Sequence, residues 1–234
     1  MDSTTFNPLL FPLSTIVDKP VPKAAFYKRA KPQRITALKT FLTDDFDSIR
    51  WLYKLHPATL NIACGQQVSE IDVFFCKMKT TNYDVSLLCE IDALIPRHTF
   101  YILDGKDRFQ LWLQPKSCNA QGVIVPANRV ERLTCARIGD TPIALKGHNM
   151  DQLYGDLLGT ISSLNTQTEA EYYEAAERRQ QLKQLETQCA ALQKRIRKEK
   201  QFPLQVELNQ ALRQLQAQIA HMKEQVSSNK NNIR

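Results

Sequence analysis

Two acidic and two basic residues share a segment that alternates apolar and polar side chains, VSEIDVFFCKMK at 68–79. They are Glu70, Asp72, Lys77 and Lys79. Metal-dependent nucleases use carboxylates to hold a divalent cation and a lysine to orient water. However, no acidic residue stands two positions before either lysine, as the usual nuclease pattern requires. We therefore favour a solvated strand face over a degenerate metal-dependent nuclease.

No other residues form a catalytic or cofactor-binding motif. The four histidines do not form HxxxH or HExxH, and neither GxGxxG nor GxxxxGK[ST] occurs. No serine or cysteine lies in a GxSxG elbow. The six cysteines stand singly without CxxC pairs, which is typical of reduced, buried thiols. We predict no catalytic residue, no metal site and no cofactor.

Basic residues gather in two places. From Lys19 to Lys39 the chain has basic residues and no acid, with Phe26 and Tyr27 between them. This pattern can bind nucleic-acid phosphates, so DNA is a possible partner. The candidate residues of this N-terminal basic patch are Lys19, Lys23, Lys28, Arg29, Lys31 and Arg34. The second cluster, KRIRKEK at 194–200, is also explained by the cations that a helix C-terminus favours.

The elements that must position these residues change along the chain. Five prolines within residues 1–34 predict an extended segment. Residues 35–165 should form an α+β domain, a small mixed sheet with flanking helices. We expect two helices, or one helix with a break, at 35–55. A strand pair should follow at 59–64 and 68–79, then a helix at 85–96, a hairpin at 98–114, short strands at 122–138 and an amphipathic helix at 150–164.

The C-terminal region, 166–234, is rich in helix formers and carries two apolar seams. The interaction seam that we predict comprises Leu182, Leu185, Leu192, Ile196, Leu208, Leu212, Leu215 and Ile219, joined by Cys189, Met222 and Val226. Leu192 and Leu208 are 16 positions apart, which is about 160° around a helix that turns roughly 100° per residue. The seams therefore cannot share one face of a straight helix. We predict an antiparallel helical hairpin, a coiled coil that reverses at 201–203 and ends in a disordered tail; a single helix kinked at Pro203 is the alternative.

The whole chain, 234 residues with 43% hydrophobic and 24% charged residues, can form a globular core plus an appendage. No apolar run approaches the ~18 residues that span a membrane. The apolar start also lacks the basic region that precedes a signal sequence. We therefore expect a cytoplasmic protein without membrane association.

Five segments resemble a bacterial family known as domain of unknown function 4391. They are PLSTIVDKPVPKAAFY, LNIACGQQVSEIDVFFCKMK, LCEIDALIPRHTFYIL, LKGHNMDQLYGDLL and KEKQFPLQVELNQALRQL. The resemblance spans nearly the whole chain and implies no active-site residue. It implies genes that lie beside helicases and site-specific DNA methyltransferases, in restriction-like or antiphage defence cassettes.

These observations lead to a functional prediction. We expect a non-catalytic accessory or adaptor subunit of such a cassette, with a helicase or DNA methyltransferase as its partner. The alternatives are a nucleic-acid-binding module that uses the N-terminal basic patch and a degenerate nuclease. The coiled coil also permits an oligomer, since its seam can pack on itself or on another chain.

Overall fold

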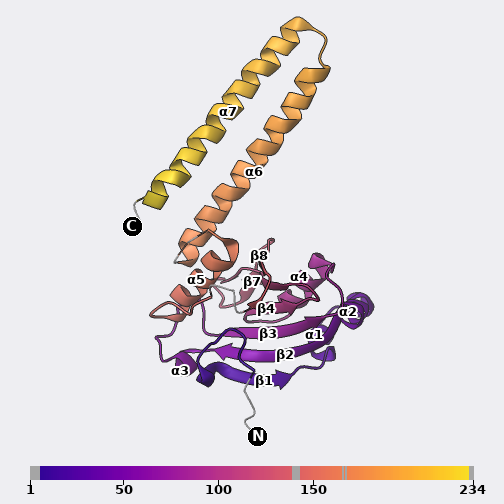
Figure 1. Ribbon diagram of the computed structural model, residues 1–234, viewed down its shortest axis with the longest axis vertical. Coiled ribbons are helices and arrows are strands. Elements are labelled where there is room, and N and C mark those ends of the chain that lie inside the picture. The colour runs from indigo at the N-terminus through magenta and orange to yellow at the C-terminus, as the bar shows by residue number, and fades with distance from the viewer. Residues whose placement is uncertain (1–5, 139–142, 165, 167, 232–234) are drawn as a thin grey trace. The chain divides into compact units, whose positions relative to one another are not determined.

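The structure is a computed structural model that describes residues 6–138, 143–164, 166 and 168–231, with side chains as far as Lys223. The chain divides into two compact units, Met1–Tyr172 and Tyr173–Arg234. The first unit holds the sheets, and the second consists of two helices (Figure 1). The described helices include none that is long and apolar enough to cross a membrane.

The first unit is built on a six-stranded mixed sheet in the order β1-β2-β3-β4-β5-β8. Strands β3 and β4 are parallel, and every other neighbouring pair is antiparallel. The strands are β1 (Ile16–Pro20), β2 (Phe46–Leu55), β3 (Ile71–Met78), β4 (His98–Asp104), β5 (Phe109–Leu113) and β8 (Glu131–Cys135). A small second sheet pairs β6 (Lys116–Cys118) with β7 (Ile124–Pro126). The predicted α+β class with a mixed sheet is confirmed.

Three helices cover one face of the large sheet: α1 (Ala24–Tyr27), α2 (Pro32–Asp45) and α4 (Val85–Ala93). Helix α4 connects β3 to the parallel strand β4, as a parallel pair requires. Under these helices, the Tyr101 ring stacks on Phe74 at 5.5 Å and meets the edge of Trp112 at 5.2 Å. Such aromatic contacts add to the stabilisation from burial of apolar area.

The opposite face is covered by α5 (Met150–Ser162) and by the N-terminal segment with the short helix η1 (Leu13–Thr15). The short helix α3 (Pro57–Leu60), which follows β2, contacts η1. Successive side chains of a strand point to opposite faces. Thus Phe75, next to Phe74, contacts Phe6 at 5.0 Å between ring centroids. Tyr154 of α5 packs its ring 4.5 Å from that of His98. The first 34 residues, expected to be extended, therefore supply an edge strand and part of the core through Leu9, Phe11 and Phe26.

One helical prediction is wrong. Residues 46–55 form the inner strand β2, while α2 continues through Thr43 and Asp44 to Asp45. The register of β2 against β3 shifts between Phe46 and Ser48 and again between Trp51 and Tyr53. Such bulges interrupt the alternation of a strand, and both faces of β2 are covered. Its apolar residues therefore fall at spacings that resemble those of a helix.

The predicted strand pair at 59–64 and 68–79 is also wrong. Strand β3 pairs with β2 and β4, whereas 57–60 is a helical turn that ends at Asn61 with a left-handed φ of 53°. Pro57 occupies the start of this turn, where its missing N–H costs nothing. Only an isolated bridge, from Ala63 to Asn149, remains of the expected strand.

The other expected elements are confirmed. Helix α4, the β4–β5 hairpin, the short strands β7 and β8, and α5 lie where the sequence patterns place them. The side chain of Asn149 caps α5 by accepting a hydrogen bond from the Gln152 N–H at 2.9 Å. That bond satisfies one of the free donors at a helix start.

The second unit is an antiparallel pair of helices, α6 (Glu169–Lys198) and α7 (Phe202–Asn231), of which α6 begins in the first unit. The predicted hairpin is confirmed, and the kinked single helix is excluded. Cys189 and Leu208 are buried, and the other described seam residues are partly buried. An ion pair of 2.8 Å from Lys223 to Glu186 joins the two helices. The Val226 side chain and the end of the predicted tail lie outside the part of the chain that is described.

Candidate functional site

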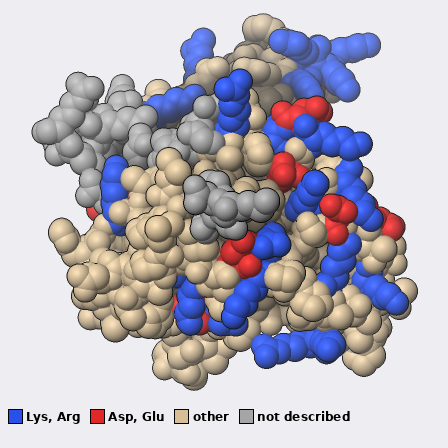
Figure 2. Space-filling model, turned by 60° about the horizontal axis from the view of Figure 1, so that its bottom comes forward, with Lys and Arg blue, Asp and Glu red and all other residues tan. Residues whose placement is uncertain are grey.

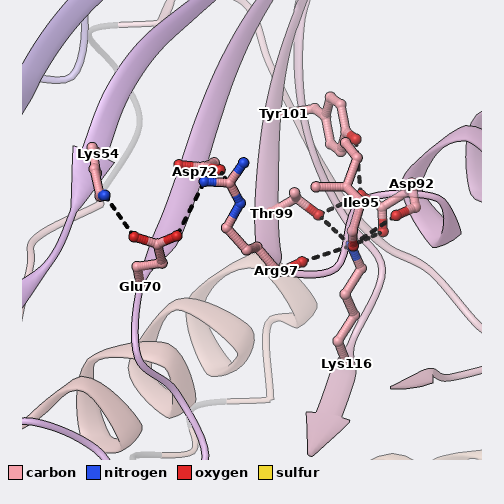
Figure 3. Close-up of polar contacts among 9 residues, drawn as sticks. All are labelled: Lys54, Glu70, Asp72, Asp92, Ile95, Arg97, Thr99, Tyr101 and Lys116. Atoms are coloured by element: carbon pink, nitrogen blue, oxygen red, sulfur yellow. Dashed lines mark hydrogen bonds and ion pairs between the residues drawn. The ribbon is translucent and has the colours of Figure 1, made fainter. Parts of the chain in front are cut away.

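A group of buried and partly buried charges lies where the parallel strands β3 and β4 begin (Figure 3). We call it the polar cluster. It comprises Lys54, Glu70, Asp72, Asp92, Arg97, Thr99, Tyr101 and Lys116. The strand register pairs Asp72 with Thr99 across β3 and β4, and Lys54 with Asp72 across β2 and β3. Strand pairing therefore brings together residues that are far apart in the sequence.

The outer half of the cluster is a bridge built by Arg97. Its guanidinium lies 3.1 Å from Glu70 Oε1 through Nη1 and 3.1 Å from Asp72 Oδ2 through Nε. Lys54 Nζ lies 2.7 Å from the other oxygen of Glu70. The Asp72 side chain is 2% exposed, whereas that of Arg97 is 43% exposed. Arg97 thus pairs with both carboxylates and reaches solvent.

The two carboxyl groups respond differently to this environment. Burial raises the pKa of Glu70, but the hydrogen bonds from Lys54 and Arg97 outweigh that effect and leave its pKa below the usual value. Deeper burial raises the pKa of Asp72 above its usual value despite the charge of Arg97. Glu70 is therefore the more strongly ionised of the two carboxyls.

The inner half is a buried pair of Lys116 and Asp92, with Nζ 3.0 Å from Oδ2 and side chains 1% and 0% exposed. The ammonium also donates to Thr99 Oγ1 at 2.9 Å and to three backbone carbonyls, Asp92 O and Arg97 O at 2.9 Å and Ile95 O at 3.3 Å. These carbonyls belong to the end of α4 and the loop that follows it. Lys116 is therefore a cation that caps the negative end of α4.

Asp92 is held by hydroxyl groups as well as by Lys116. Tyr101 donates to Asp92 Oδ1 at 2.8 Å, and Thr99 donates to the same oxygen. Burial raises the pKa of Asp92 and lowers that of Lys116, while the opposite charges act against both shifts. The pair joins α4, β4 and the β6 strand by interactions within the chain.

This geometry does not bring Lys77 or Lys79 to the two carboxylates, as the nuclease alternative would require. Lys77 and Lys79 lie near the far end of β3, where Lys77 is 4.0 Å from Asp47 and Lys79 donates to Thr43 O at 2.8 Å. At ~3.3 Å per residue, Lys77 is about 16 Å along the strand from Asp72. The expected solvated strand face is wrong for Asp72, whose side chain is buried and paired with Arg97. Among the described residues, no group of three His, Cys, Asp or Glu side chains could hold a metal ion.

Three cations of the cluster, Lys54, Arg97 and Lys116, were not expected from the sequence. Lys54 and Arg97 stand in no motif, and Lys116 lies after the predicted hairpin at 98–114. Lys116 follows the apolar run FQLWL by three residues, after Gln114 and Pro115. Its burial is notable, because lysine is almost never fully buried unless it is paired. Nothing in the sequence indicates that Asp92 is its partner.

In the structure, two residues of the N-terminal basic patch are engaged in contacts and the other four are exposed. Lys23 donates to Phe46 O at 2.5 Å, and burial lowers its pKa. Arg34 forms a 2.6 Å ion pair with Glu90. The other four candidates, Lys19, Lys28, Arg29 and Lys31, are exposed, and no ion pair joins them to any residue that the structure describes. Lys and Arg cover more of the face in Figure 2 than Asp and Glu do, in keeping with the net charge of +7.

A separate set of hydrogen bonds surrounds Asp151 in the first turn of α5. Its carboxylate accepts hydrogen bonds from the N–H groups of Gln66, Gln67 and Val68 at 2.6, 3.0 and 2.8 Å. At Gly65 a Cβ would lie 2.3 Å from Asp151 Oδ1. This carboxylate therefore fixes the loop that leads into β3.

Comparison with known protein families assigns the chain to one family. The profile of one family, described as Domain of unknown function (DUF4391), matches residues 9–219 of the chain. No curated protein and no solved structure matches it. The match covers both the sheet-containing unit and most of the helical hairpin. The chain therefore belongs to the domain of unknown function 4391 family.

Proposed function

We propose that this protein is a cytoplasmic, non-catalytic adaptor subunit that binds a partner protein through the end of its helical hairpin. One observation carries the proposal. Among the hairpin side chains that the structure describes, the exposed large apolar ones are Phe202 and Val206, which are 75% and 50% exposed. Both lie in the first turns of α7, directly after the reversal.

The position of these two residues on α7 supports the proposal. Val206 precedes the buried Leu208 by two residues, so it points about 200° away from the seam. Phe202 and Val206 are four residues apart and therefore share a helix face. The seam between α6 and α7 cannot cover them, and a partner can bury them. Aromatic side chains that fill a partner's pocket often dominate the energy of an interface.

The polar cluster supports a non-catalytic role. Each of its carboxylates is already paired with a cation of the same chain, and the Lys116–Asp92 pair is enclosed. A substrate or metal ion would have to displace Arg97 to reach Glu70 and Asp72. The arrangement stabilises the start of β3 and β4 and the end of α4.

The family resemblance suggests the identity of the partner. It implies genes beside helicases and DNA methyltransferases in bacterial restriction-like or antiphage defence cassettes. We therefore propose one of these enzymes as the bound partner.

Co-purification tests the adaptor role. The tagged full chain is co-expressed with the products of the genes that flank its own, and a stable complex with a helicase or methyltransferase is expected. The Phe202→Ser, Val206→Ser double variant should lose most of the captured partner. The control, Gln210→Ser with Gln214→Ser, changes two exposed positions of the same helix and should retain it. A wild-type chain that elutes alone, or a double variant that captures as much as wild type, contradicts the proposal.

Nucleic-acid binding through the N-terminal basic patch is the second candidate. It is favoured by four exposed cations, Lys19, Lys28, Arg29 and Lys31, that have no ion-pair partner among the described residues. A salt titration of DNA binding with the variant Lys28→Gln, Arg29→Gln, Lys31→Gln tests this surface. If the patch is the interface, this variant loses affinity at low salt, because contacts to phosphates depend on these charges.

A further inference from the structure

We propose that the outward face of α6 next to the reversal binds the phosphate backbone of a nucleic acid. The residues are Lys194, Arg195, Arg197 and Lys198, with Lys200 in the connection to α7. We call this set the α6 basic face. It lies in the second unit, whereas the N-terminal basic patch lies in the first. The inference goes beyond the adaptor role and does not depend on it.

The cations of the α6 basic face are not neutralised within the chain. All five are exposed, and no ion pair joins any of them to a described residue. One acid, Glu199, lies among them in the sequence. Its Oε1 accepts hydrogen bonds from the N–H groups of Lys200 and Gln201, both at 2.9 Å. That carboxylate therefore holds the turn and is not paired with a neighbouring cation.

Helix geometry places these charges on one side of α6. Ile196 marks the seam, and Lys194 and Lys198 are each two residues away, which is about 200° around the helix. Arg195 and Arg197 lie about 100° to either side of Ile196 and flank the face. Lys194, Arg195, Lys198 and Glu199 line a shallow, open hollow of about 340 Å³. The face is therefore positively charged and open to solvent.

The dipole of α6 does not explain why these cations gather at its end. Cations in the last turn of an isolated helix stabilise its negative end. In the hairpin, however, the positive start of α7 follows the end of α6 after three residues, so the two partial charges largely cancel. Helix α7 also has no acid in its first turn to attract the cations. The cluster is left with an excess positive charge that an external anion can neutralise.

The spacing of the cations on the α6 basic face indicates that its ligand is a polyanion. The four cations of α6 lie within residues 194–198, about 6 Å of helix axis at ~1.5 Å per residue, and their side chains point to more than one side of the helix. A single phosphate cannot contact all of them, whereas duplex DNA carries one negative charge per ~1.7 Å of its axis. The face carries no aromatic or large apolar side chain to insert between bases or lipids, and Phe202 and Val206 belong to the other helix. We therefore assign it to backbone contact, which does not depend on base sequence.

Fluorescence anisotropy with the full chain and a labelled duplex of mixed sequence, at 50 to 200 mM salt, tests the inference. The variant Lys194→Gln, Arg195→Gln, Lys198→Gln should bind at least about tenfold more weakly at 50 mM salt. Its plot of log affinity against log salt should be shallower by about 2 to 3, because each phosphate contact contributes ~0.9 to the slope. Glutamine is a good helix former, so circular dichroism should match that of wild type.

The matched control is the variant Lys77→Gln, Lys106→Gln, Arg108→Gln, which removes the same charge from exposed positions of the first unit that belong to neither basic surface. It should bind the duplex within about twofold of wild type. The inference is overturned by a wild-type chain that binds no duplex at 50 mM salt, or by a control variant that loses as much affinity as the α6 variant. Binding to anionic lipid vesicles without binding to the duplex also overturns it. Partner capture in the co-purification assay is a separate readout, so failure of one proposal does not imply failure of the other.

Discussion

At the scale of single residues, the buried charges decide the stability of the first unit. Lys116 is the clearest case, because its ammonium contacts the Asp92 carboxylate, the Thr99 hydroxyl and three carbonyls. Removing one member of a buried ion pair leaves the other charge without compensation. The contribution of Lys116 can therefore be measured as the free energy of unfolding that is lost when it is replaced.

Lys116→Met should lower the free energy of unfolding by about 3–5 kcal/mol, because Asp92 and the carbonyls at the end of α4 lose their donor. Urea denaturation followed by tryptophan fluorescence measures this change. The control Lys77→Met removes an exposed lysine that is 4.0 Å from Asp47 and should change stability by less than about 0.5 kcal/mol. Equal effects of the two variants would show that the buried pair contributes nothing specific.

Glu169, the first residue of α6, should make stability depend on pH. Burial, with a smaller contribution from the negative charge of Asp151, raises its pKa from 4.5 to about 7. Between these values the folded chain binds more protons than the unfolded chain, so stability falls as pH rises from 4.5 to 7 and then levels off. Glu169→Gln should remove this decrease and stabilise the protein at pH 8 by about 1–3 kcal/mol. Urea midpoints at pH 5 and 8 measure it, and an unchanged pH dependence in the variant contradicts the assignment.

At the scale of elements, close packing between α5 and the chain that follows it depends on glycine. At Gly155 a Cβ would lie 2.6 Å from the backbone of Thr168 and Glu169, and at Gly159 it would lie 2.2 Å from Thr166 O. Real Cβ atoms do not approach backbone so closely. The two glycines, four residues apart on one helix face, therefore allow the start of α6 to lie against α5.

Gly155→Ala should destabilise the protein by about 1–3 kcal/mol, because overpacking against backbone is costly. This loss outweighs the gain of up to about 1 kcal/mol that alanine brings to a helix interior. Thr160→Ala, at a partly exposed position of α5, serves as the control and should change stability by less than about 1 kcal/mol. Thermal or urea unfolding measures both, and a stabilised Gly155 variant would refute the close approach.

Strand β2 shows at the element scale why pattern and structure can differ. Periodicity identified α4, α5 and both long helices, because each has one apolar face. The β4–β5 hairpin was indicated instead by two β-rich runs on either side of Gly105. It failed at β2, where two bulges and burial from both sides remove the alternation. It also failed at 59–64, where Pro57 and the left-handed Asn61 form a turn between apolar residues.

At the scale of the whole molecule, the two units suit different tasks. In the first unit, buried charges such as Lys116 and Asp92 pair with each other. In the second unit, apolar and cationic side chains beside the reversal are exposed to solvent. In the proposals above, α7 contacts a protein through Phe202 and Val206, and α6 contacts phosphates through its basic face. An adaptor that joins an enzyme to its nucleic acid would need both surfaces.

The sequence by itself determined the family, the α+β class and the helical hairpin, because apolar periodicity and the phase of two seams are local properties. It also indicated the absence of standard catalytic motifs. Only the tertiary structure decided that Arg97 and Lys116 pair with carboxylates on other elements, that Lys23 and Arg34 are engaged while Lys28 is free, and that Phe202 is exposed. These outcomes depend on strand order and register, which bring together residues that no local pattern connects.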